Sequence, residues 1–381
     1  MKTKIFIAGA GGIGKAVAII LKNQEDFPVD IIFGDIHEES AVAAKRFVSE
    51  GIHNESGIES IKMPQSGSNA DLDRKLEQCD IILDCLPGSQ APRMATLARA
   101  FGCHYANLTE YVSETGEVEQ IARNADTAFV LQTGLAPGFI NVLACQQYNE
   151  FVRDFGTEIL DSMHMKVGAL SKHATSPHFY AFTWSPIGVA TEYLKKAIIV
   201  RSFQTIEVPA LSGRQTIIID GDEYEDNFTS GGAADLPQAF SGRIKDLDYK
   251  TLRYPGHYGW VEAALSTIPE NEDRVKSLER IMLQNIPSVE DDEVVVYASV
   301  QGKDSMGRLR RKEASYRIYP TYVGTRKLRA IQTTTAAPMC EVARLMIQKK
   351  WKGAIKQSMI DPLDFLNGPF VSSIYGKYNG I

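Results

Sequence analysis

Apolar and polar positions follow two different rhythms along this chain, and the first rhythm covers residues 1–135. Short apolar runs alternate there with segments whose apolar positions recur at helical spacing. We predict strands over residues 4–8, 29–34, 58–63, 80–84, 103–107 and 128–133, and helices over 15–23, 41–49 and 72–78. Strands that alternate with helices are typical of a parallel sheet with helices on both faces.

The second rhythm begins after about residue 155, where apolar and polar positions alternate over longer strands. We predict strands over residues 159–170, 198–208, 215–220, 223–229, 292–300, 308–319 and 327–333. The segment GKDSMG at 302–307 is predicted to be the hairpin connection between two of them. A helical pattern over 139–152 precedes these strands, and an amphipathic pattern over 339–350 follows them. The pattern indicates an α+β domain with a mostly antiparallel sheet.

A glycine-rich turn stands between the first predicted strand and the first predicted helix. The stretch GAGGIG comprises Gly9, Ala10, Gly11, Gly12, Ile13 and Gly14. In a dinucleotide-binding motif, the first glycine permits the tight turn, the second lets the backbone approach a pyrophosphate, and the third lets helix and strand pack closely. Because the motif has the strand before it and the helix after it, we interpret all six residues as cofactor-binding.

An acidic residue follows the second strand at the spacing that this motif expects. Asp35 lies 21 residues after Gly14, and Ile36 rather than an arginine comes next. A carboxylate there accepts hydrogen bonds from ribose hydroxyls and repels a 2′-phosphate. The sequence therefore favours NAD over NADP.

These observations define the fold class and the domains. A chain of 381 residues is too long to fold around one ordinary hydrophobic core, so we expect two domains. The predicted fold is α/β, with a Rossmann-type doubly wound parallel sheet in residues 1–135 and the α+β domain in residues 136–334. We expect residues 335–381 to return to the first domain.

Composition narrows the function classes. The net charge of −6 disfavours a nucleic-acid partner, because phosphate binding requires a basic face. No apolar run is long enough to predict a membrane span, although the N-terminus superficially resembles a signal peptide. The five cysteines are odd in number and irregularly spaced, which indicates reduced thiols and a cytoplasmic protein. No zinc spacing is present, and we predict no metal site.

Two further loops follow predicted strands of the first domain. In a doubly wound sheet, ligands bind beyond the carboxyl ends of the strands. Cys85, Leu86 and Pro87 would then border the cofactor, although a plain Pro-Gly turn explains Cys85 equally well. The loop at 134–138 leads into a helix whose start would face the nicotinamide or the substrate, and a domain hinge is the alternative interpretation.

Three clusters in the second domain carry more aromatic, hydroxyl and glycine residues than a sheet requires: YAFTWSPIG at 180–188, FTSGGAADLP at 228–237 and KTLRYPGHYGW at 250–260. Thr229 and Ser230 carry hydroxyls that suit a carboxylate or the cofactor, or else form an ordinary turn. Arg253 has the planar fork that grips a carboxylate with two hydrogen bonds.

Together these motifs resemble the saccharopine dehydrogenase family, including its L-lysine 6-dehydrogenase branch. The resemblance is carried by GAGGIG, GLAPGFINVLA at 134–144, TSGG at 229–232, YKTLRYPGH at 249–257 and the late TTTAAP. It spans nearly the whole chain. It implies a Rossmann domain completed by the C-terminal segment, a middle domain on the substrate side, and NAD(P)-dependent chemistry at a carbon that bears an amine.

The resemblance also implies roles for individual residues. Arg253 would hold a substrate carboxylate, and Asn107 and Thr109 would border cofactor and substrate, although family members often differ there. Leu135, Ala136 and Pro137 would form the loop beside the nicotinamide. Where some relatives have an acid in this loop, Ala136 stands here, so no acid–base role is available at that position.

The proton acceptor for the amine is open. His257 has a suitable intrinsic pKa and is our candidate catalytic residue, while a packing histidine at a helix start is the alternative. The substrate would be saccharopine or, alternatively, L-lysine undergoing oxidative deamination, and the protein a homodimer. A different class, a non-catalytic dinucleotide-binding protein, also fits the missing obvious base. A sugar dehydrogenase is disfavoured because no EKP tripeptide follows the fourth strand.

Overall fold

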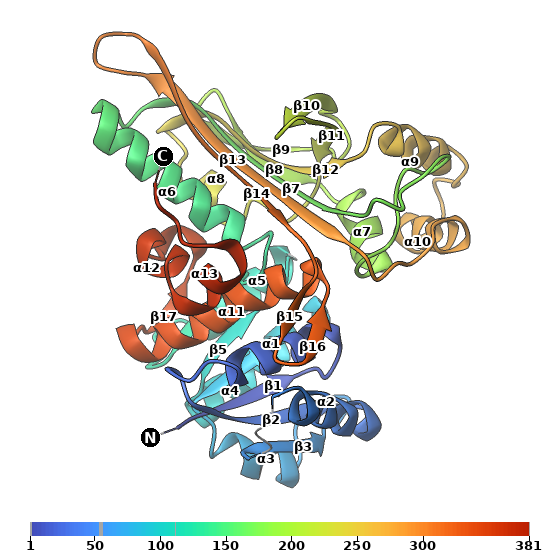
Figure 1. The fold of residues 1–381 in the computed structure, drawn as a ribbon, viewed down its shortest axis with the longest axis vertical. Coiled ribbons are helices and arrows are strands. Elements are labelled where there is room, and N and C mark those ends of the chain that lie inside the picture. The colour runs from blue at the N-terminus through green and yellow to red at the C-terminus, as the bar shows by residue number, and fades with distance from the viewer. Residues whose placement is uncertain (1, 53–55, 111, 381) are drawn as a thin grey trace. The chain divides into compact units, whose positions relative to one another are not determined.

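The computed structural model describes residues 2–52, 56–110 and 112–380 (Figure 1). The chain divides into two compact units. Unit 1 comprises residues 1–139, 321–328 and 332–378, and unit 2 comprises residues 140–320, 329–331 and 379–381. The C-terminal segment, orange to red in Figure 1, thus belongs to the same unit as the blue N-terminal strands.

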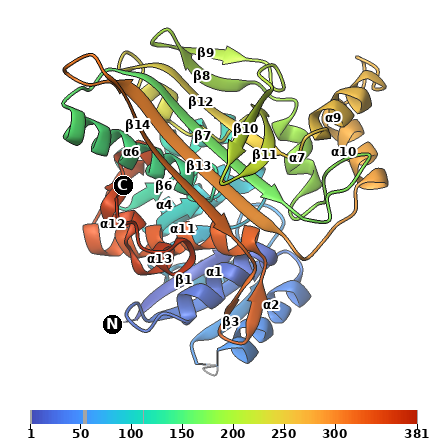
Figure 2. The same cartoon turned by 45° about the horizontal axis from the view of Figure 1, so that its top comes forward.

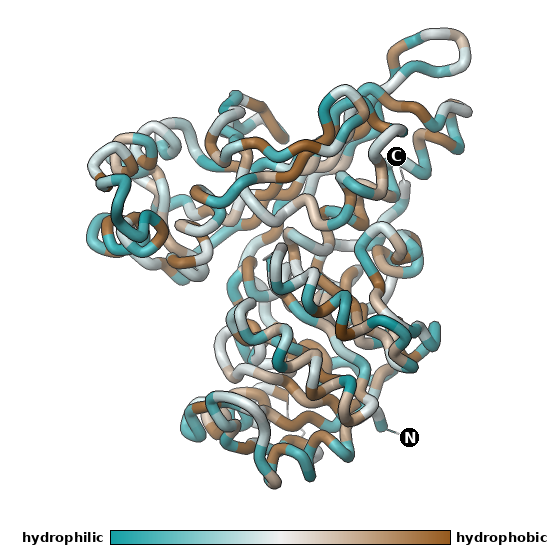
Figure 3. The backbone as a smooth tube through the Cα atoms, turned by 180° about the vertical axis from the view of Figure 1, so that it is seen from behind, coloured by the Kyte–Doolittle hydropathy of each residue, from teal (hydrophilic) through white to brown (hydrophobic). Residues whose placement is uncertain are grey.

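Unit 1 is built on a seven-stranded parallel sheet with the strand order β17-β6-β5-β4-β1-β2-β3. Its strands are β1 (Thr3–Ala8), β2 (Val29–Asp35), β3 (Ile58–Lys62), β4 (Ile81–Asp84), β5 (His104–Asn107), β6 (Ala128–Val130) and β17 (Gly353–Ile355). The strands β1, β2, β4 and β6 are mostly apolar and buried because helices cover both faces of the sheet, and brown stretches run through this unit in Figure 3. The predicted Rossmann-type sheet is confirmed.

Helices of unit 1 pack on the two faces of this sheet. The helices are α1 (Gly12–Lys22), α2 (Glu38–Gly51), α3 (Ala70–Leu76), α4 (Ala91–Phe101), α5 (Val112–Ile121), most of α11 (Ala330–Lys349), α12 (Pro362–Leu366) and α13 (Pro369–Tyr375). Apolar residues of α3, α4 and α5 share one core with Phe6, Ile82 and Phe129. The helix α11 packs against α1, where the thiol of Cys340 donates a hydrogen bond to the carbonyl of Val17 at 3.5 Å. A small ribbon of β15 (Thr321–Val323) and β16 (Arg326–Leu328) completes the unit.

Unit 2 holds an eight-stranded sheet in the order β10-β11-β12-β7-β13-β14, with β8 and β9 attached at β12. Its strands are β7 (Leu160–Leu170), β8 (Ala197–Arg201), β9 (Gln204–Val208), β10 (Gln215–Ile219), β11 (Asp222–Phe228), β12 (Ile244–Arg253), β13 (Glu293–Lys303) and β14 (Leu309–Ile318). The pair β12 and β7 is parallel, and the other pairs are antiparallel. The predicted mostly antiparallel sheet is confirmed, and Figure 2 shows the long β13–β14 hairpin beside β7.

The helices of unit 2 are α6 (Phe139–Phe155), α7 (Pro186–Glu192), α8 (Leu236–Ala239), α9 (His257–Ser266) and α10 (Arg274–Asn285). Three of them, α7, α9 and α10, form a separate apolar core with Tyr180 and Phe182. This small core matters for the site because it surrounds the start of α9, directly after the end of β12.

The sequence-based boundaries were wrong at two places. Residues 198–208 form a hairpin of β8 and β9 rather than one strand, because Ser202 and Phe203 adopt positive φ values of 49° and 69°. Two-residue hairpin turns usually contain Asn-Gly or another glycine pair, and neither is present. Residues 327–333 are not a strand, since β16 ends at Leu328 and α11 begins at Ala330.

The helix α11 therefore starts nine residues before the predicted start at Met339, and it contains Pro338. Proline lacks an N–H and usually ends a helix, so Pro338 gives no local sign that a helix continues through it. A carboxylate far away in the sequence begins the helix instead. Asp292 accepts hydrogen bonds from the backbone N–H groups of Ala330 at 2.7 Å and Ile331 at 2.8 Å.

In the described residues, no helix is both long and apolar enough to cross a membrane. The same residues contain no group of three or more histidine, cysteine or acidic side chains arranged to hold a metal ion. The five cysteines are all free thiols.

Candidate active site

The turn between β1 and α1 has the geometry of a pyrophosphate cradle. Gly9 has a φ of +96°, and a Cβ there would lie 3.0 Å from the backbone carbonyl of Cys85. A Cβ on Gly14 would lie 2.0 Å from the oxygen of Gly9, which a side chain cannot approach. A Cβ on Gly11 would meet nothing within 4 Å, so the space outside this residue is open.

The start of α1 also has the electrostatics that a phosphate requires. Gly11 caps the helix without any side-chain hydrogen bond, and the first turn contains no acidic residue. The backbone N–H groups at this end can therefore face an anion. The residues present fit a dinucleotide, and Gly9 to Gly14 would hold its pyrophosphate.

Asp35, at the end of β2, is fixed beside this turn. One carboxylate oxygen accepts a hydrogen bond from the N–H of Ala10, and the other accepts from the N–H of His37, both at 2.9 Å. Each oxygen keeps a further lone pair, so the carboxylate can still accept from ribose hydroxyls.

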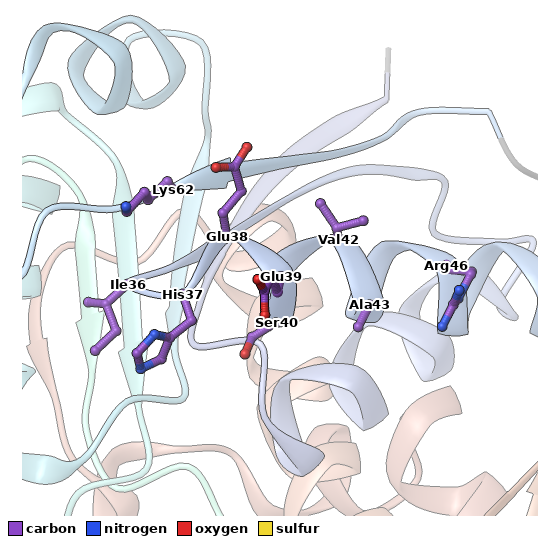
Figure 4. A pocket seen from close by; sticks show the side chains of 9 residues that line it. All are labelled: Ile36, His37, Glu38, Glu39, Ser40, Val42, Ala43, Arg46 and Lys62. Carbon is purple, nitrogen blue, oxygen red and sulfur yellow. The ribbon is translucent and has the colours of Figure 1, made fainter.

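A pocket of about 900 Å³ opens beyond the end of β2 (Figure 4). It is lined by Ile36, His37, Glu38, Glu39, Ser40, Val42, Ala43, Arg46 and Lys62. Acidic and basic side chains both line it, so the charge of the lining does not favour a ribose over a phosphorylated ribose. The lining is consistent with both NAD and NADP.

The turn after β4 contacts the glycine turn directly. The N–H of Cys85 donates to the carbonyl of Ala8 at 2.8 Å, and a side-chain methyl of Leu86 lies 3.2 Å from where a Cβ on Gly9 would stand. Pro87 follows and leads into a short 3₁₀ turn. The Cys85 sulfur lies 3.8 Å from the sulfur of Met339, and burial raises the pKa of its thiol far above the usual range. The thiol is therefore protonated, and the backbone of this turn is what borders the cradle.

Sequence reasoning missed Asp84, the last residue of β4. Its carboxylate is buried and accepts from the hydroxyl of Tyr105 at 2.8 Å and from the N–H of Leu86 at 3.0 Å. Burial raises the pKa of Asp84 to about 7. An acidic residue that ends an apolar strand was the signal that could have found it.

The loop at 134–138 folds back on itself. The N–H of Gly134 donates to the carbonyl of Pro137 at 3.0 Å, and the N–H of Phe139 donates to the carbonyl of Gly134 at 2.8 Å. Gly138 has a φ of +136°, and a Cβ there would lie 2.0 Å from the Gly134 oxygen. Leu135, Ala136 and Pro137 form the crest of this closed loop, which places them together at the carboxyl end of β6.

Asn107 and Thr109 are both buried. Asn107 braces the ends of β5 and β6, because its side-chain oxygen accepts from the N–H of Gln132 at 2.9 Å. Its carbonyl accepts from the N–H and the hydroxyl of Thr133, each at 2.8 Å. These hydrogen bonds give Asn107 a structural role in holding β5 and β6 together. The predicted contact of Asn107 with the substrate stays a prediction.

In unit 2, Arg253 ends β12 and is buried, with 1% of its surface exposed. Its Nε donates to the hydroxyl of Tyr193 at 2.7 Å, and its Nη1 donates to the carbonyl of Leu252 at 2.9 Å. The ring centroids of Tyr180 and Tyr193 lie 4.7 Å and 5.6 Å from the guanidinium carbon. These rings stabilise a cation through their π faces.

Within the described residues, no carboxylate oxygen lies within 4.0 Å of the Arg253 guanidinium nitrogens. The carboxylate of Glu192 contributes to the electrostatic field at Arg253 from beyond ion-pair distance. A buried charge without a paired counter-ion is costly, which makes Arg253 a candidate to bind an anionic ligand.

The backbone between Arg253 and α9 requires glycine. Gly256 has a φ of +102°, and a Cβ there would lie 2.7 Å from the ring of Phe179. Its N–H donates to Glu225 at 3.0 Å. Pro255 and Gly256 thus end the strand and turn the chain so that His257 is the first residue of α9.

His257 is fully buried, and both of its ring nitrogens are engaged. Nδ1 lies 2.7 Å from the carbonyl oxygen of His178, and Nε2 lies 3.0 Å from the hydroxyl of Tyr193. Burial, together with the charge of Arg253, lowers the pKa of His257 to about 3. This environment favours the packing alternative over a general base that reaches the substrate.

The structure brings the second-domain candidates together. The hydroxyl of Thr229 lies 2.7 Å from that of Thr251, two residues before Arg253 on β12. The N–H of Ser230 donates to the carbonyl of Glu192, next to Tyr193, at 3.1 Å. Thr229, Ser230, Arg253 and His257 therefore form one cluster in unit 2.

The remaining candidates lie in unit 1. The glycine turn, Asp35 and the Cys85–Pro87 turn contact one another, while Asn107, Thr109 and the 134–138 loop surround the ends of β5 and β6. Sequence reasoning missed Tyr193 and His178. Tyr193 lies in TEYLKK, which carries no signal of a site, and only the fold brings it to Arg253.

Comparisons with known proteins agree with this description. The family described as "Saccharopine dehydrogenase NADP binding domain" matches residues 5–132, and "Saccharopine dehydrogenase C-terminal domain" matches residues 134–371. Mitochondrial alpha-aminoadipic semialdehyde synthase from Mus musculus is 20% identical over 210 residues, which are 54% of this chain. The match covers 21% of that curated relative's length.

Two solved structures have a similar fold. Saccharopine dehydrogenase (L-Glu forming) from Saccharomyces cerevisiae superposes with a TM-score of 0.72 and 16% identity, covering 98% of each chain. A homospermidine synthase from Legionella pneumophila, solved in complex with NAD, has a TM-score of 0.69 and 14% identity, covering all of this chain and 91% of its own.

At these identities the structures support the fold, while the two family matches cover nearly the whole chain. This protein belongs to the saccharopine dehydrogenase family and has the dinucleotide-binding oxidoreductase fold of that family.

Proposed function

We propose that this protein is an NAD(P)-dependent oxidoreductase that acts on the C–N bond of an amino acid, with Arg253 as the anchor for a substrate carboxylate. The observation that carries the proposal is the buried guanidinium without an ion-pair partner in the described residues. A carboxylate is the counter-ion that matches its planar fork.

The chemistry divides between the cofactor and the protein. A bound nicotinamide dinucleotide would accept or supply the hydride, and Gly9 to Gly14 with Asp35 would hold it. Arg253 binds the substrate carboxylate and fixes the position of the amine-bearing carbon. The rings of Tyr180 and Tyr193 keep water from the guanidinium, which strengthens its attraction for a carboxylate.

Saccharopine is the first candidate substrate, with oxidation at its secondary amine. Oxidative deamination of L-lysine is the alternative, since lysine also carries a carboxylate beside an amine. One of the two similar structures is a homospermidine synthase, so a polyamine is a further candidate substrate. Both amino acids suit Arg253 better than a polyamine does. A polyamine has no carboxylate, and its positive charges would be repelled by a buried guanidinium.

The experiment is a panel of saccharopine and L-lysine, each with NAD and with NADP, followed by the absorbance of the reduced cofactor. Released products distinguish the two substrates, because lysine deamination releases ammonia and saccharopine oxidation does not. No turnover with any combination would leave the non-catalytic dinucleotide-binding protein as the better interpretation.

Arg253→Ala provides the residue-level test. We expect kcat/KM to fall about a thousandfold, because the substrate carboxylate loses its charged partner. The affinity for NADH, measured by fluorescence titration, should change by less than about twofold, since the cofactor residues lie in the other unit. Full turnover in this variant would contradict the proposed anchor.

A further inference from the structure

The guanidinium of Arg253 offers only part of its donor set to a ligand. An arginine side chain has five N–H donors. In the described residues, Nε is used by Tyr193 and one N–H of Nη1 is used by the carbonyl of Leu252. What remains is one N–H on Nη1 and both on Nη2. A carboxylate can therefore be gripped end-on by the two terminal nitrogens, and the edge that includes Nε is closed.

The donor and acceptor roles are fixed in the hydrogen bonds that link Tyr193 to His257 and His257 to His178. A carbonyl oxygen accepts but never donates, so the 2.7 Å contact to His178 requires a hydrogen on Nδ1 of His257. In the neutral ring, Nε2 is then an acceptor, and the Tyr193 hydroxyl must donate to it across 3.0 Å. The Tyr193 oxygen is left with lone pairs that accept from Nε of Arg253 at 2.7 Å.

The imidazole of His257 must be neutral for Tyr193 to donate to it. If His257 were protonated, Nε2 would also donate toward Tyr193, whose own hydrogen would lose its acceptor. The groups that surround the ring are Tyr180, Tyr193, Tyr258, Trp260, His178 and Arg253. None of them carries a negative charge, and Arg253 carries a positive one. The buried carboxylate of Glu192 acts on Tyr193 and Arg253 but is not among the groups that shift the pKa of His257. Burial and this charge keep His257 neutral, with a pKa of about 3.

We propose that His257 and Tyr193 are positioning residues, which orient the guanidinium of Arg253 so that its two terminal nitrogens grip a ligand carboxylate end-on. His257 acts through Tyr193 and does not exchange a proton with the substrate. The inference rests on the proposed function for the identity of the substrate. The grip itself can be measured with a carboxylate that undergoes no reaction.

The test uses the full chain with NADH bound and two probes. Glutarate, which has carboxylates and no amine, reports binding by calorimetry, and saccharopine reports turnover. Tyr193→Phe and His257→Leu each break the chain of hydrogen bonds. We expect each to weaken glutarate binding about tenfold, which is the usual contribution of one such hydrogen bond to a charged group. For saccharopine, KM should rise by a similar factor while kcat changes little.

Three comparisons separate positioning from a general structural effect. The double variant should bind glutarate no more weakly than Tyr193→Phe alone, because either change already breaks the same chain. His257→Gln, whose amide oxygen can accept from Tyr193, should recover most of the affinity. Tyr148→Phe is the matched control, since it removes a partly buried hydroxyl that donates to the Glu158 carbonyl instead, and glutarate binding should be unchanged.

The dependence of kcat/KM on pH distinguishes positioning from proton transfer. His257→Gln should retain the wild-type pH profile, because the histidine is neutral throughout the working range. Loss of a limb of that profile, with a large fall in kcat, would overturn the inference in favour of a catalytic base. Additive effects in the double variant, or unchanged glutarate binding in both single variants, would also overturn it.

The outcomes for the two proposals are distinct. If the wild-type protein binds glutarate and the variants weaken it, the positioning inference stands even where no amino acid is oxidised. If the wild-type protein oxidises saccharopine but the variants bind glutarate normally, the proposed function stands and the positioning inference fails. If glutarate and saccharopine both fail to bind the wild-type protein, the anchor and its positioning fail together.

Discussion

At the scale of single residues, the informative positions are those whose neighbours in space differ from their neighbours in sequence. Arginine chemistry and its motif pointed to Arg253 as a candidate, and the structure shows it buried at the end of β12, while its anchor role stays a prediction. Its partner Tyr193 could not be predicted, because a single tyrosine directly after a short helix has no periodic or spacing signal. The same holds for the choice at His257, since only the two contacts of its ring distinguish a base from a packing residue.

Asp84 gives a prediction at this scale. Its pKa is raised from an ordinary 3.8 to about 7 by burial, so the folded protein holds a proton there that the unfolded chain has lost. Stability from the neutral carboxyl is therefore complete below about pH 4 and is lost as the pH rises toward 7. We expect Asp84→Asn, which resembles the neutral form, to remove this loss, a difference of at most about 4 kcal/mol.

Urea denaturation of both proteins at pH 5 and pH 8 measures this difference. The amide introduced at position 84 can donate to the Tyr105 oxygen while Tyr105 donates to the carbonyl of Ala91, which lies 3.2 Å away in the native protein. The substitution is therefore compatible with the surrounding hydrogen bonds. An identical change in unfolding free energy between the two pH values for both proteins would show that Asp84 titrates normally.

At the scale of elements, periodicity predicted the strands of the parallel sheet well because those runs are short, apolar and bounded by turns. It failed where a single contact between residues far apart in the sequence determines where an element begins. The helix α11 begins at Ala330 because Asp292 satisfies two N–H groups at its start, and no local pattern contains that information. Likewise, the β8–β9 turn is made by Ser202 and Phe203, whose positive φ values are imposed by pairing of the two strands.

Asp292→Ala should therefore destabilise the first turn of α11. Two N–H groups at the helix start lose this acceptor, and we expect a cost of about 2 kcal/mol in the free energy of unfolding. Hydrogen exchange should be faster at Ala330 and Ile331 and unchanged in the middle of the helix. Asp292→Asn is the control, because its amide oxygen retains one acceptor and should recover part of the stability. Equal protection of both amides in the alanine variant would argue against the cap.

At the scale of the whole molecule, the fold class and the presence of two sheets could be predicted, and the family comparisons agree with both. The seventh strand of the parallel sheet could not. The strand β17 has three residues, too few for any period to be visible, and its partner β6 is also short. The homodimer and the cytoplasmic location stay predictions.

Truncation after Lys350 tests the structural role of the C-terminal segment. It removes β17 from the edge of the sheet, the stacking of Tyr375 on Phe139 at 3.6 Å, and the hydrogen bond from Gln357 to the carbonyl of Leu131. We expect unit 1 to lose its cooperative unfolding transition and its affinity for NADH. A truncation after Tyr378 leaves these contacts in place and serves as the control. Normal NADH binding by the shorter protein would show that β17 is dispensable.

The pairing of β17 with β6 also constrains the order in which the protein can form during synthesis. Residues 140–320 of unit 2 leave the ribosome as one uninterrupted stretch, whereas the parallel sheet lacks its edge strand until Gly353–Ile355 has been synthesised. Nascent chains generally fold as each domain emerges. We therefore expect unit 2 to become protease-resistant before the nucleotide-binding unit does, although the first strand of that unit precedes unit 2 in the chain.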